Sequence, residues 1–299
     1  MAGQGGEKPN DPASQSKMET KSDEASSLET KWNTKNLASR LAADLASAAS
    51  AAVLVAPLIS IIDRSIMENA SGRANLGASI KNSLRSLLLQ PHTMMFSRPV
   101  ALIFMVYGGT YLTANVLDTA TSTVKNKPAT LVTSGTAKFA SSSAANISMG
   151  IYKDQVYARL FGPVGKAVRA VPAPSYVLFT LRDCMTIFAS FNIPMMLGPQ
   201  VGDMMSEEMR RRVSGQTLVQ FAAPALVQIA STPVHLLGLD LYNRPRSQAT
   251  GLPTWGERWA QVYKNWGISV MARLCRIIPA YGIGGVVNSK VRRNLMERL

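Results

Sequence analysis

The sequence predicts an all-α membrane protein with six transmembrane helices arranged as three pseudo-symmetric repeats. Apolar residues make up 46% of the 299 positions and gather in long blocks, with most of the charged 17% between them. The net charge of +14 falls in the segments that separate the apolar blocks, as is typical of loops in membrane proteins. A pattern of two spans also recurs three times along the chain, which indicates an internal repeat.

Residues 1–36 are expected to form a disordered tail. The segment is rich in Gly, Ser, Glu, Lys and Asp and has almost no apolar residues to bury. It lacks the apolar core of a secretory signal, and its acidic residues are atypical of a cleaved mitochondrial presequence. The folded part is therefore expected over residues 37–299.

The first repeat is expected to contain spans at 37–66 and 98–117. The first span is long enough to cross about 30 Å of hydrocarbon, and its many Ala and Ser residues permit close helix contacts. Pro57 is expected to kink it. An amphipathic helix is predicted at 76–89, where four apolar side chains share one face.

The remaining spans are predicted at 130–160, 171–197, 217–241 and 268–291. The first of these is nearly all small or hydroxylated over its middle, so it needs packing against other helices. A second amphipathic helix is expected at 254–266, ending at Gly267.

The repeat is anchored by Pro57, Ser148 and Pro233, which are 91 and 85 residues apart. Each anchor is followed by a polar linker and by a second span that opens on a proline. Three pairs of spans place both termini on the same side of the membrane.

The third repeat carries a recognisable order: a surface helix, Gly267, and an apolar segment that contains Arg276-Ile-Ile-Pro279. This order resembles the second half of a repeat in the mitochondrial carrier family (solute carrier family 25). The resemblance covers residues 37–299, as repeats at about 37–120, 128–200 and 213–299. It implies a six-helix barrel with short amphipathic matrix-side helices and a multi-pass location in the mitochondrial inner membrane, with the outer membrane as the alternative.

The sequence departs from that family at its most diagnostic charges. Odd-numbered carrier helices read Pro-x-acid-x-x-base. The acidic places here hold Ile59, Gly150 and His235, and the basic places hold Ile62, Lys153 and Gly238. Since one of six charges survives, the ionic networks of the family are expected to be lost.

Arg276, Arg169 and Arg182 are the candidate substrate-binding residues. The resemblance implies that Arg276 and Arg169 face a central cavity, where a guanidinium would suit a carboxylate or phosphate. The alternative is that they extend to the membrane interface. Arg182 and Asp183 lie within an apolar span, which indicates either a cavity or gate role or a static ion pair between helices.

The other candidate gate or kink residues are Pro57, Pro233, Lys153, Asp183 and His235. For His235, a packed neutral histidine and a functional one are equally compatible with the sequence. No phosphate-binding loop, metal-ligand set or nucleophile triad is visible, so neither an enzyme nor a metal or other cofactor is expected.

Two functions fit these features. The first is a carrier-like transporter that moves a small anionic metabolite, a carboxylate among the candidates, by alternating access. The second is a non-transporting membrane adaptor or assembly factor, suggested by the missing networks. Basic loops could bind lipid headgroups such as cardiolipin, nucleic acid is not expected, and a monomer is favoured with the oligomeric state open.

Overall fold

The computed structural model describes residues 32–133, 136–163, 170–244 and 253–299, and the regular structure within these ranges is helical. Most of it belongs to five long helices: α2 (Leu37–Ala70), α5 (Arg98–Val124), α6 (Thr136–Leu160), α7 (Ala173–Met204) and α9 (Gly215–Asn243). A sixth long segment joins three pieces: α10 (Trp255–Ile277), the π-helical η1 (Ile278–Gly284) and α11 (Gly285–Met296). The short helices are α3 (Leu76–Leu89), α4 (Pro91–Met95) and α8 (Glu207–Arg212).

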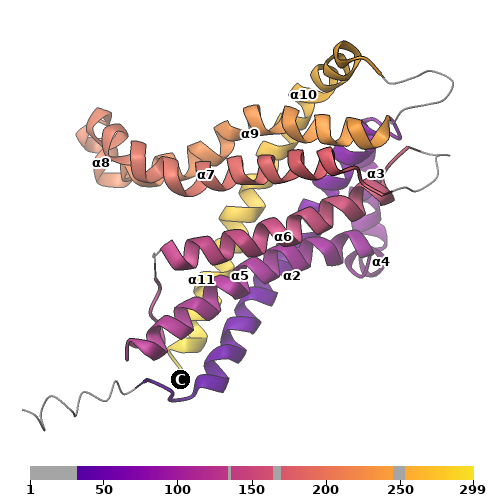
Figure 1. The fold of residues 1–299 in the computed structure, drawn as a ribbon. Helices are drawn as coiled ribbons and strands as arrows, with labels where there is room; N and C mark the ends of the chain where they lie inside the picture. Colours follow the sequence, from indigo (N-terminus) through magenta and orange to yellow (C-terminus); the bar gives the residue numbers. More distant parts are fainter. Residues whose placement is uncertain (1–31, 134–135, 164–169, 245–252) are drawn as a thin grey trace, which may run out of the picture.

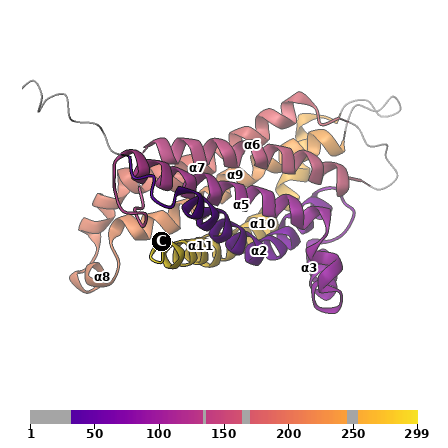
Figure 2. The same cartoon turned by 90° about the horizontal axis from the view of Figure 1, so that it is seen from below.

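The six long segments pack in chain order, and the last returns to the first. Contacts link α2 with α5, α5 with α6, α6 with α7, α7 with α9 and α9 with α10, while η1 and α11 contact α2. In Figure 1, α7 and α9 run side by side. Figure 2 shows that α3 and α8 lie at opposite ends of the molecule, as they also do in Figure 1.

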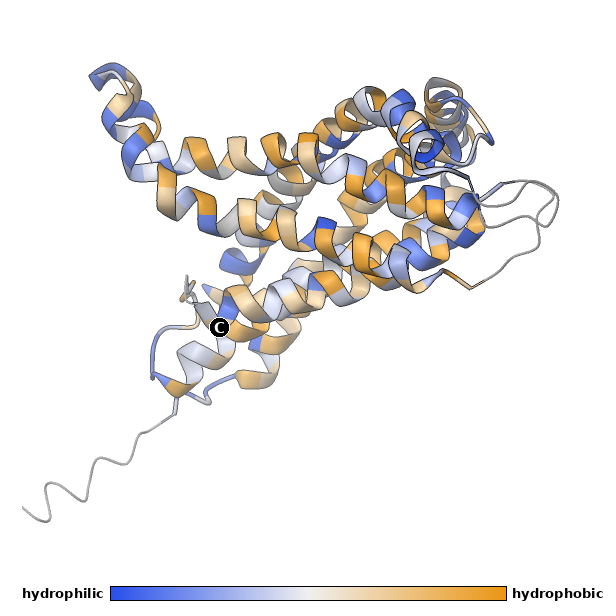
Figure 3. Cartoon of the chain, turned by 45° about the horizontal axis from the view of Figure 1, so that its top comes forward, coloured by the Kyte–Doolittle hydropathy of each residue, from blue (hydrophilic) through white to orange (hydrophobic). Residues whose placement is uncertain are grey.

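Three helices, α2, α5 and α9, are long and apolar enough to cross a membrane by length and composition alone. The prediction of an all-helical membrane protein with transmembrane helices is therefore confirmed for the described residues. The predicted six-span carrier barrel is not established by these criteria. Figure 3 shows hydrophobic residues along the long helices, with hydrophilic residues gathered toward the ends of the molecule.

The distribution of polar and apolar side chains differs from that of a water-soluble protein, although an apolar core is also buried. Large apolar side chains are exposed on the outer faces, including Leu54 at 50%, Val177 at 66% and Leu226 at 64%. Charged side chains such as Asp154 and Arg182 are buried instead. An apolar exterior around a charged interior suits a protein whose outer faces contact lipid.

The last long segment differs from its prediction. The sequence predicts that Gly267 ends a surface helix, but α10 continues through it to Ile277. One glycine costs about 1 kcal/mol relative to alanine in a helix interior, which the packing of a 23-residue helix can offset. The irregularity comes later, in η1, which contains Pro279 and so lacks one backbone donor. Tyr111 of α5 donates a hydrogen bond to the Ala280 carbonyl at 2.8 Å.

The α7–α9 hairpin depends on glycine where the two backbones meet. A Cβ at Gly215 would lie 2.3 Å from the backbone nitrogen of Gly202, and a Cβ at Gly198 would lie 2.8 Å from the Cα of Gln216. Small residues of this kind let helices approach closely in a membrane. The hairpin carries several of the charged residues described below.

The two ends of the folded region lie together. The Asn36 side-chain amide, at the start of α2, donates to the Leu299 carbonyl at 2.8 Å. The backbone N–H of Asn33 donates to the Thr123 carbonyl near the end of α5 at 2.9 Å. Almost all of the predicted tail, 1–36, lies outside the described residues.

Candidate functional site: a polar cavity between two ionic networks

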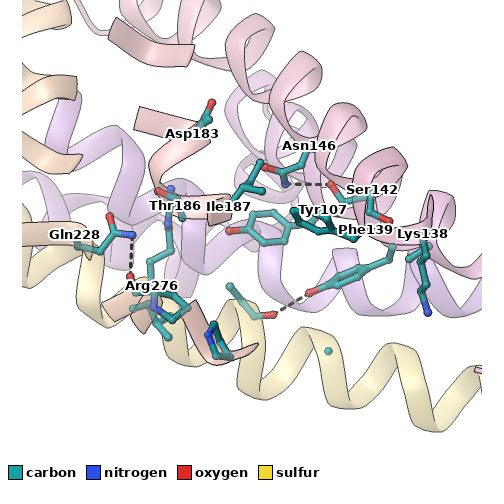
Figure 4. A pocket seen from close by; sticks show the side chains of 18 of the residues that line it. Tyr107, Lys138, Phe139, Ser142, Asn146, Asp183, Thr186, Ile187, Gln228 and Arg276 are labelled. Carbon is teal, nitrogen blue, oxygen red and sulfur yellow. Dashed lines mark hydrogen bonds between the residues drawn. The ribbon is translucent and has the colours of Figure 1, made fainter. Parts of the chain in front are cut away.

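A cavity of about 620 Å³ lies between the long helices. Figure 4 shows Arg276, Thr186 and Gln228 toward one end of it and Lys138 toward the other. The polar and charged side chains of its wall are Tyr107, Thr110, Tyr111, Thr133, Lys138, Ser142, Asn146, Arg182, Asp183, Thr186, Gln216, Gln228, Arg273 and Arg276. The cavity therefore offers hydroxyl, amide, cationic and anionic groups to a small molecule.

One end of the cavity borders a cluster of paired charges, which we name the central ionic network. Its members are Asp63, Lys153, Asp154, Arg182, Asp183 and Arg276. Asp63 meets Lys153 and Arg276, each at 2.8 Å. Asp154 meets Lys153 at 2.6 Å and Arg182 at 2.7 Å. Arg182 also meets Asp183 at 2.5 Å. The network joins α2, α6, α7 and α10.

The central ionic network is largely removed from solvent. The side chain of Asp154 is fully buried and that of Asp63 is 7% exposed. Charges at such depth are tolerated only with partners, and removal of one partner leaves an uncompensated buried charge. The network therefore contributes strongly to the relative positions of the four helices in this state.

His235 of α9 is packed against the same network. Its Nδ1 lies 2.8 Å from Nη1 of Arg182, and its ring centroid lies 5.2 Å from that of Phe179. Because a guanidinium only donates hydrogen bonds, Nδ1 accepts and the ring proton lies on Nε2. The structure thus places His235 as a neutral, hydrogen-bonded histidine that orients Arg182.

A second cluster, which we name the terminal ionic network, consists of Asp44, Asp118, Lys138 and Arg292. Arg292 of α11 meets Asp44 at 2.7 Å and Asp118 at 3.9 Å, and Lys138 meets Asp118 at 2.7 Å. Asp44 precedes Asp63 by 19 residues on α2, which corresponds to about 28 Å along the helix. The two networks therefore lie near opposite ends of α2.

The structure brings most of the predicted site residues to one place. Arg276, Arg182 and Asp183 line the cavity and belong to the central ionic network. Lys153 belongs to the same network behind the cavity wall. Arg169 lies outside the described residues. Their roles as substrate contacts or gates remain predictions.

The two candidate kink prolines lie within uninterrupted helices. Pro57 is inside α2 and Pro233 is inside α9. Each lacks the amide hydrogen that its position in the helix would otherwise donate. Both helices contribute to the surroundings of the networks, through Asp63 on α2 and His235 on α9.

The prediction that the ionic networks are lost is wrong. The expected acidic places hold Ile59 and Gly150, but Asp63 and Asp154 follow them by four residues each. Four residues is about one helical turn, so the carboxylates stay on the same helix faces, one turn further along. The surviving Lys153 then pairs with both of them.

Several charged residues of the two networks and the cavity were not among the predicted site residues. They are Asp44, Asp63, Asp118, Lys138, Asp154, Arg273 and Arg292. The sequence feature that could have identified them is an ionisable residue inside or at the end of an apolar span, because such a residue is costly there without a partner.

Residues 47–296 match a family model described as "Probable citrulline exporter". The search of curated proteins finds no match for this chain.

The family match corrects the resemblance drawn from the repeats. The matching model is the probable citrulline exporter family, not the mitochondrial carrier family, so the carrier assignment is wrong. The mitochondrial inner membrane location rested on that assignment and loses its support. A multi-pass membrane transporter agrees both with the family description and with the apolar helices. Because the match covers most of its 299 residues, the chain belongs to the probable citrulline exporter family.

Proposed function

We propose that the protein is a membrane transporter, not an enzyme, and that it exports citrulline through the cavity between its long helices. The observation that carries this proposal is a cavity lined by charged and hydrogen-bonding side chains in a molecule with large apolar side chains exposed on its outer faces. Its volume of about 620 Å³ lies within the range of about 300–1,000 Å³ typical of small-molecule sites. The family description supplies citrulline as the substrate.

The position of the chain ends supports an even number of membrane crossings. Asn36 at the start of α2 is hydrogen-bonded to Leu299, so the helical region begins and ends on one side. The three apolar helices alone would place these ends on opposite sides. The remaining long segments, of which α6 is the shortest at 25 residues and about 37 Å, can each supply a further crossing.

The chemistry of the cavity wall suits citrulline. At neutral pH citrulline carries a carboxylate, an ammonium group and a neutral ureido group, so its net charge is close to zero. The wall provides guanidinium groups for a carboxylate, the Asp183 carboxylate for an ammonium group, and Asn146 and Gln228 for a ureido group. The Oδ2 atom of Asp183 is buried and has no hydrogen-bond partner within the described residues. We thus favour a zwitterionic substrate over the anionic one predicted from the sequence.

The two ionic networks supply a basis for alternating access. Arg276 of the central ionic network and Lys138 of the terminal ionic network lie toward opposite ends of the cavity (Figure 4). Transporters open the two ends of a central site in turn. A network formed in one state and broken in the other shifts the populations by its differential free energy. Both networks are formed in this structure.

The adaptor hypothesis has lost its main support. It rested on the absence of ionic networks, whereas two such networks border the cavity. A structural adaptor also has no need for a cavity lined by charged and hydrogen-bonding side chains.

Reconstitution tests the proposal. Purified protein in liposomes loaded with labelled citrulline should release the label faster than protein-free liposomes. Ornithine, which lacks the ureido group, should compete weakly. Absence of citrulline movement in either direction, with correctly inserted protein, would reject the proposed function.

Membrane topology provides a second test. Protease-accessible tags placed before Trp32 and after Leu299 should be cleaved from the same side of sealed vesicles. Cleavage from opposite sides would require an odd number of crossings and would contradict the six-span arrangement.

A further inference from the structure

Within the described residues, one buried guanidinium on the cavity wall has no partner. Arg273 is 4% exposed and lines the cavity, one helical turn before Arg276 on α10. Within the described residues it makes no hydrogen bond or ion pair, and its Nε atom is fully enclosed without an acceptor. A buried charge in this condition is costly, because it has lost water and gained nothing in return.

A second buried arginine shows how this fold satisfies a guanidinium with a structural role. Arg40 is 1% exposed and forms no ion pair within the described ranges. It nevertheless donates to the carbonyl oxygens of Asn33 at 2.9 Å and Thr119 at 3.3 Å, and to the Ser122 hydroxyl. Arg273 differs from Arg40 in having no such acceptors and in facing a cavity.

The carboxylates of the central ionic network are already engaged. Asp63 is held by Lys153 and Arg276, while Asp154 is held by Lys153 and Arg182. Asp183 is held through one oxygen by Arg182. Together with Arg273, this end of the cavity contains four cationic side chains against three carboxylates. A ligand that brings a carboxylate would remove the imbalance.

We propose that Arg273 is the residue that binds the carboxylate of the transported amino acid, an inference that rests on the proposed export of citrulline. The planar fork of a guanidinium can hold both oxygens of a carboxylate at once, and burial strengthens these charge-assisted hydrogen bonds. Arg276 is less suited to this task because Asp63 already occupies one of its nitrogens at 2.8 Å. The site accordingly selects molecules with a free carboxylate and rejects the same molecules without one.

Competition by citrulline and by citrulline amide tests the assignment. The amide keeps the ammonium and ureido groups and replaces only the carboxylate with a neutral group. In proteoliposomes, unlabelled citrulline should inhibit labelled citrulline movement with an IC50 about 10- to 150-fold lower than that of the amide, the range expected for one charge-assisted contact. Arg273→Gln should reduce this ratio to within about threefold of 1, and Arg273→Lys should give an intermediate ratio because lysine lacks the fork.

Arg40→Gln is the matched control, because it also removes a buried guanidinium that forms no ion pair with another described residue. It should lower the amount of folded protein but keep the wild-type ratio between citrulline and its amide. If Arg273→Gln kept the wild-type ratio between the IC50 values of citrulline amide and citrulline, the assignment would be overturned while citrulline export stood. Where the glutamine variant does not fold, a wild-type ratio in Arg273→Lys would overturn it in the same way.

A binding measurement separates this inference from the proposed function. Citrulline should raise the melting temperature of the wild-type protein in detergent more than citrulline amide does, and this difference should vanish in Arg273→Gln. If the wild type moves no citrulline but shows this carboxylate-dependent stabilisation, export is rejected and the binding role of Arg273 stands. Equal stabilisation of wild type and Arg273→Gln by citrulline rejects the role of Arg273.

Discussion

The central and terminal ionic networks are built from the same residue types, and each contains equal numbers of carboxylates and cations, yet they differ in their relation to the cavity and in the buried arginine beside each. In the terminal ionic network two carboxylates meet two cations, and one of its members, Lys138, reaches the cavity wall. In the central ionic network the carboxylates are shared by several cations, and Arg182, Asp183 and Arg276 all line the cavity. Arg273, which has no acceptor within the described residues, lies beside the central ionic network, whereas the buried Arg40 beside the terminal ionic network donates to backbone carbonyl oxygens.

The difference separates two uses of buried charge. A network whose neighbouring arginine is satisfied by protein oxygens holds helices together and needs nothing from outside the protein. A network beside an arginine without an acceptor at a cavity wall is complete only when a ligand adds an anionic group. The charged end of the cavity is therefore where we expect substrate to bind, and the terminal end is where we expect a structural closure.

The largest expected effect is at Asp63. Asp63→Ala should remove the carboxylate that holds both Lys153 and Arg276, and leave two buried cations with fewer partners. The expected loss of folding free energy is about 3–5 kcal/mol. Thermal unfolding of the purified protein in detergent would measure it. A loss below about 1 kcal/mol would mean that the central ionic network is not formed in the main state in solution.

Asp44 tests the terminal ionic network in the same way. Asp44→Ala should remove the contact with Arg292 at 2.7 Å and the acceptor of the Thr119 hydroxyl at 2.6 Å. Arg292 keeps its hydrogen bond to Thr119, so the expected loss of about 2–4 kcal/mol is smaller than at Asp63. The same unfolding assay applies. A larger loss at Asp44 than at Asp63 would reverse the predicted order of the two networks.

A neutral pair beside the terminal ionic network should contribute less. The side-chain amides of Asn115 and Asn288 donate to each other at 2.9 and 3.0 Å while buried. Asn115→Ala and Asn288→Ala should each lower stability by about 1–3 kcal/mol, since each leaves a buried amide without its partner. In a double-mutant cycle, the double variant should lose less than the sum of the two. Strict additivity would show that the amides do not interact.

The smallest effect is expected at the exposed ion pair near α8. Arg210 and Asp203 are 3.6 Å apart, and their side chains are 54% and 86% exposed. Asp203→Ala should change the unfolding free energy by less than about 0.5 kcal/mol, because solvent screens the pair. This variant also serves as the control for the substitutions at Asp63 and Asp44. A loss comparable with theirs would indicate a general effect of removing acidic residues.

The local pattern of apolar and polar residues predicted the positions of several helices. The first amphipathic helix lies at Leu76–Leu89, the range that its apolar face predicts, because helical periodicity is a property of neighbouring residues. The predicted end of a helix at Gly267 was wrong, since helix propensity is a weak preference that packing of the flanking turns outweighs. Composition likewise predicted the apolar spans of α2, α5 and α9.

Length, hydropathy and helical period are local quantities, so the sequence is enough to identify a helical membrane protein with charges inside its apolar blocks. Which charges meet depends instead on how the helices pack. Asp63 and Arg276 are 213 positions apart, and Asp44 and Arg292 are 248 apart, so no periodicity links them. The same holds for Arg273, which the sequence presents as one more arginine beside Arg276. Among the residues that the structure describes it lacks an acceptor because the folded helices bring the nearby carboxylates to other partners.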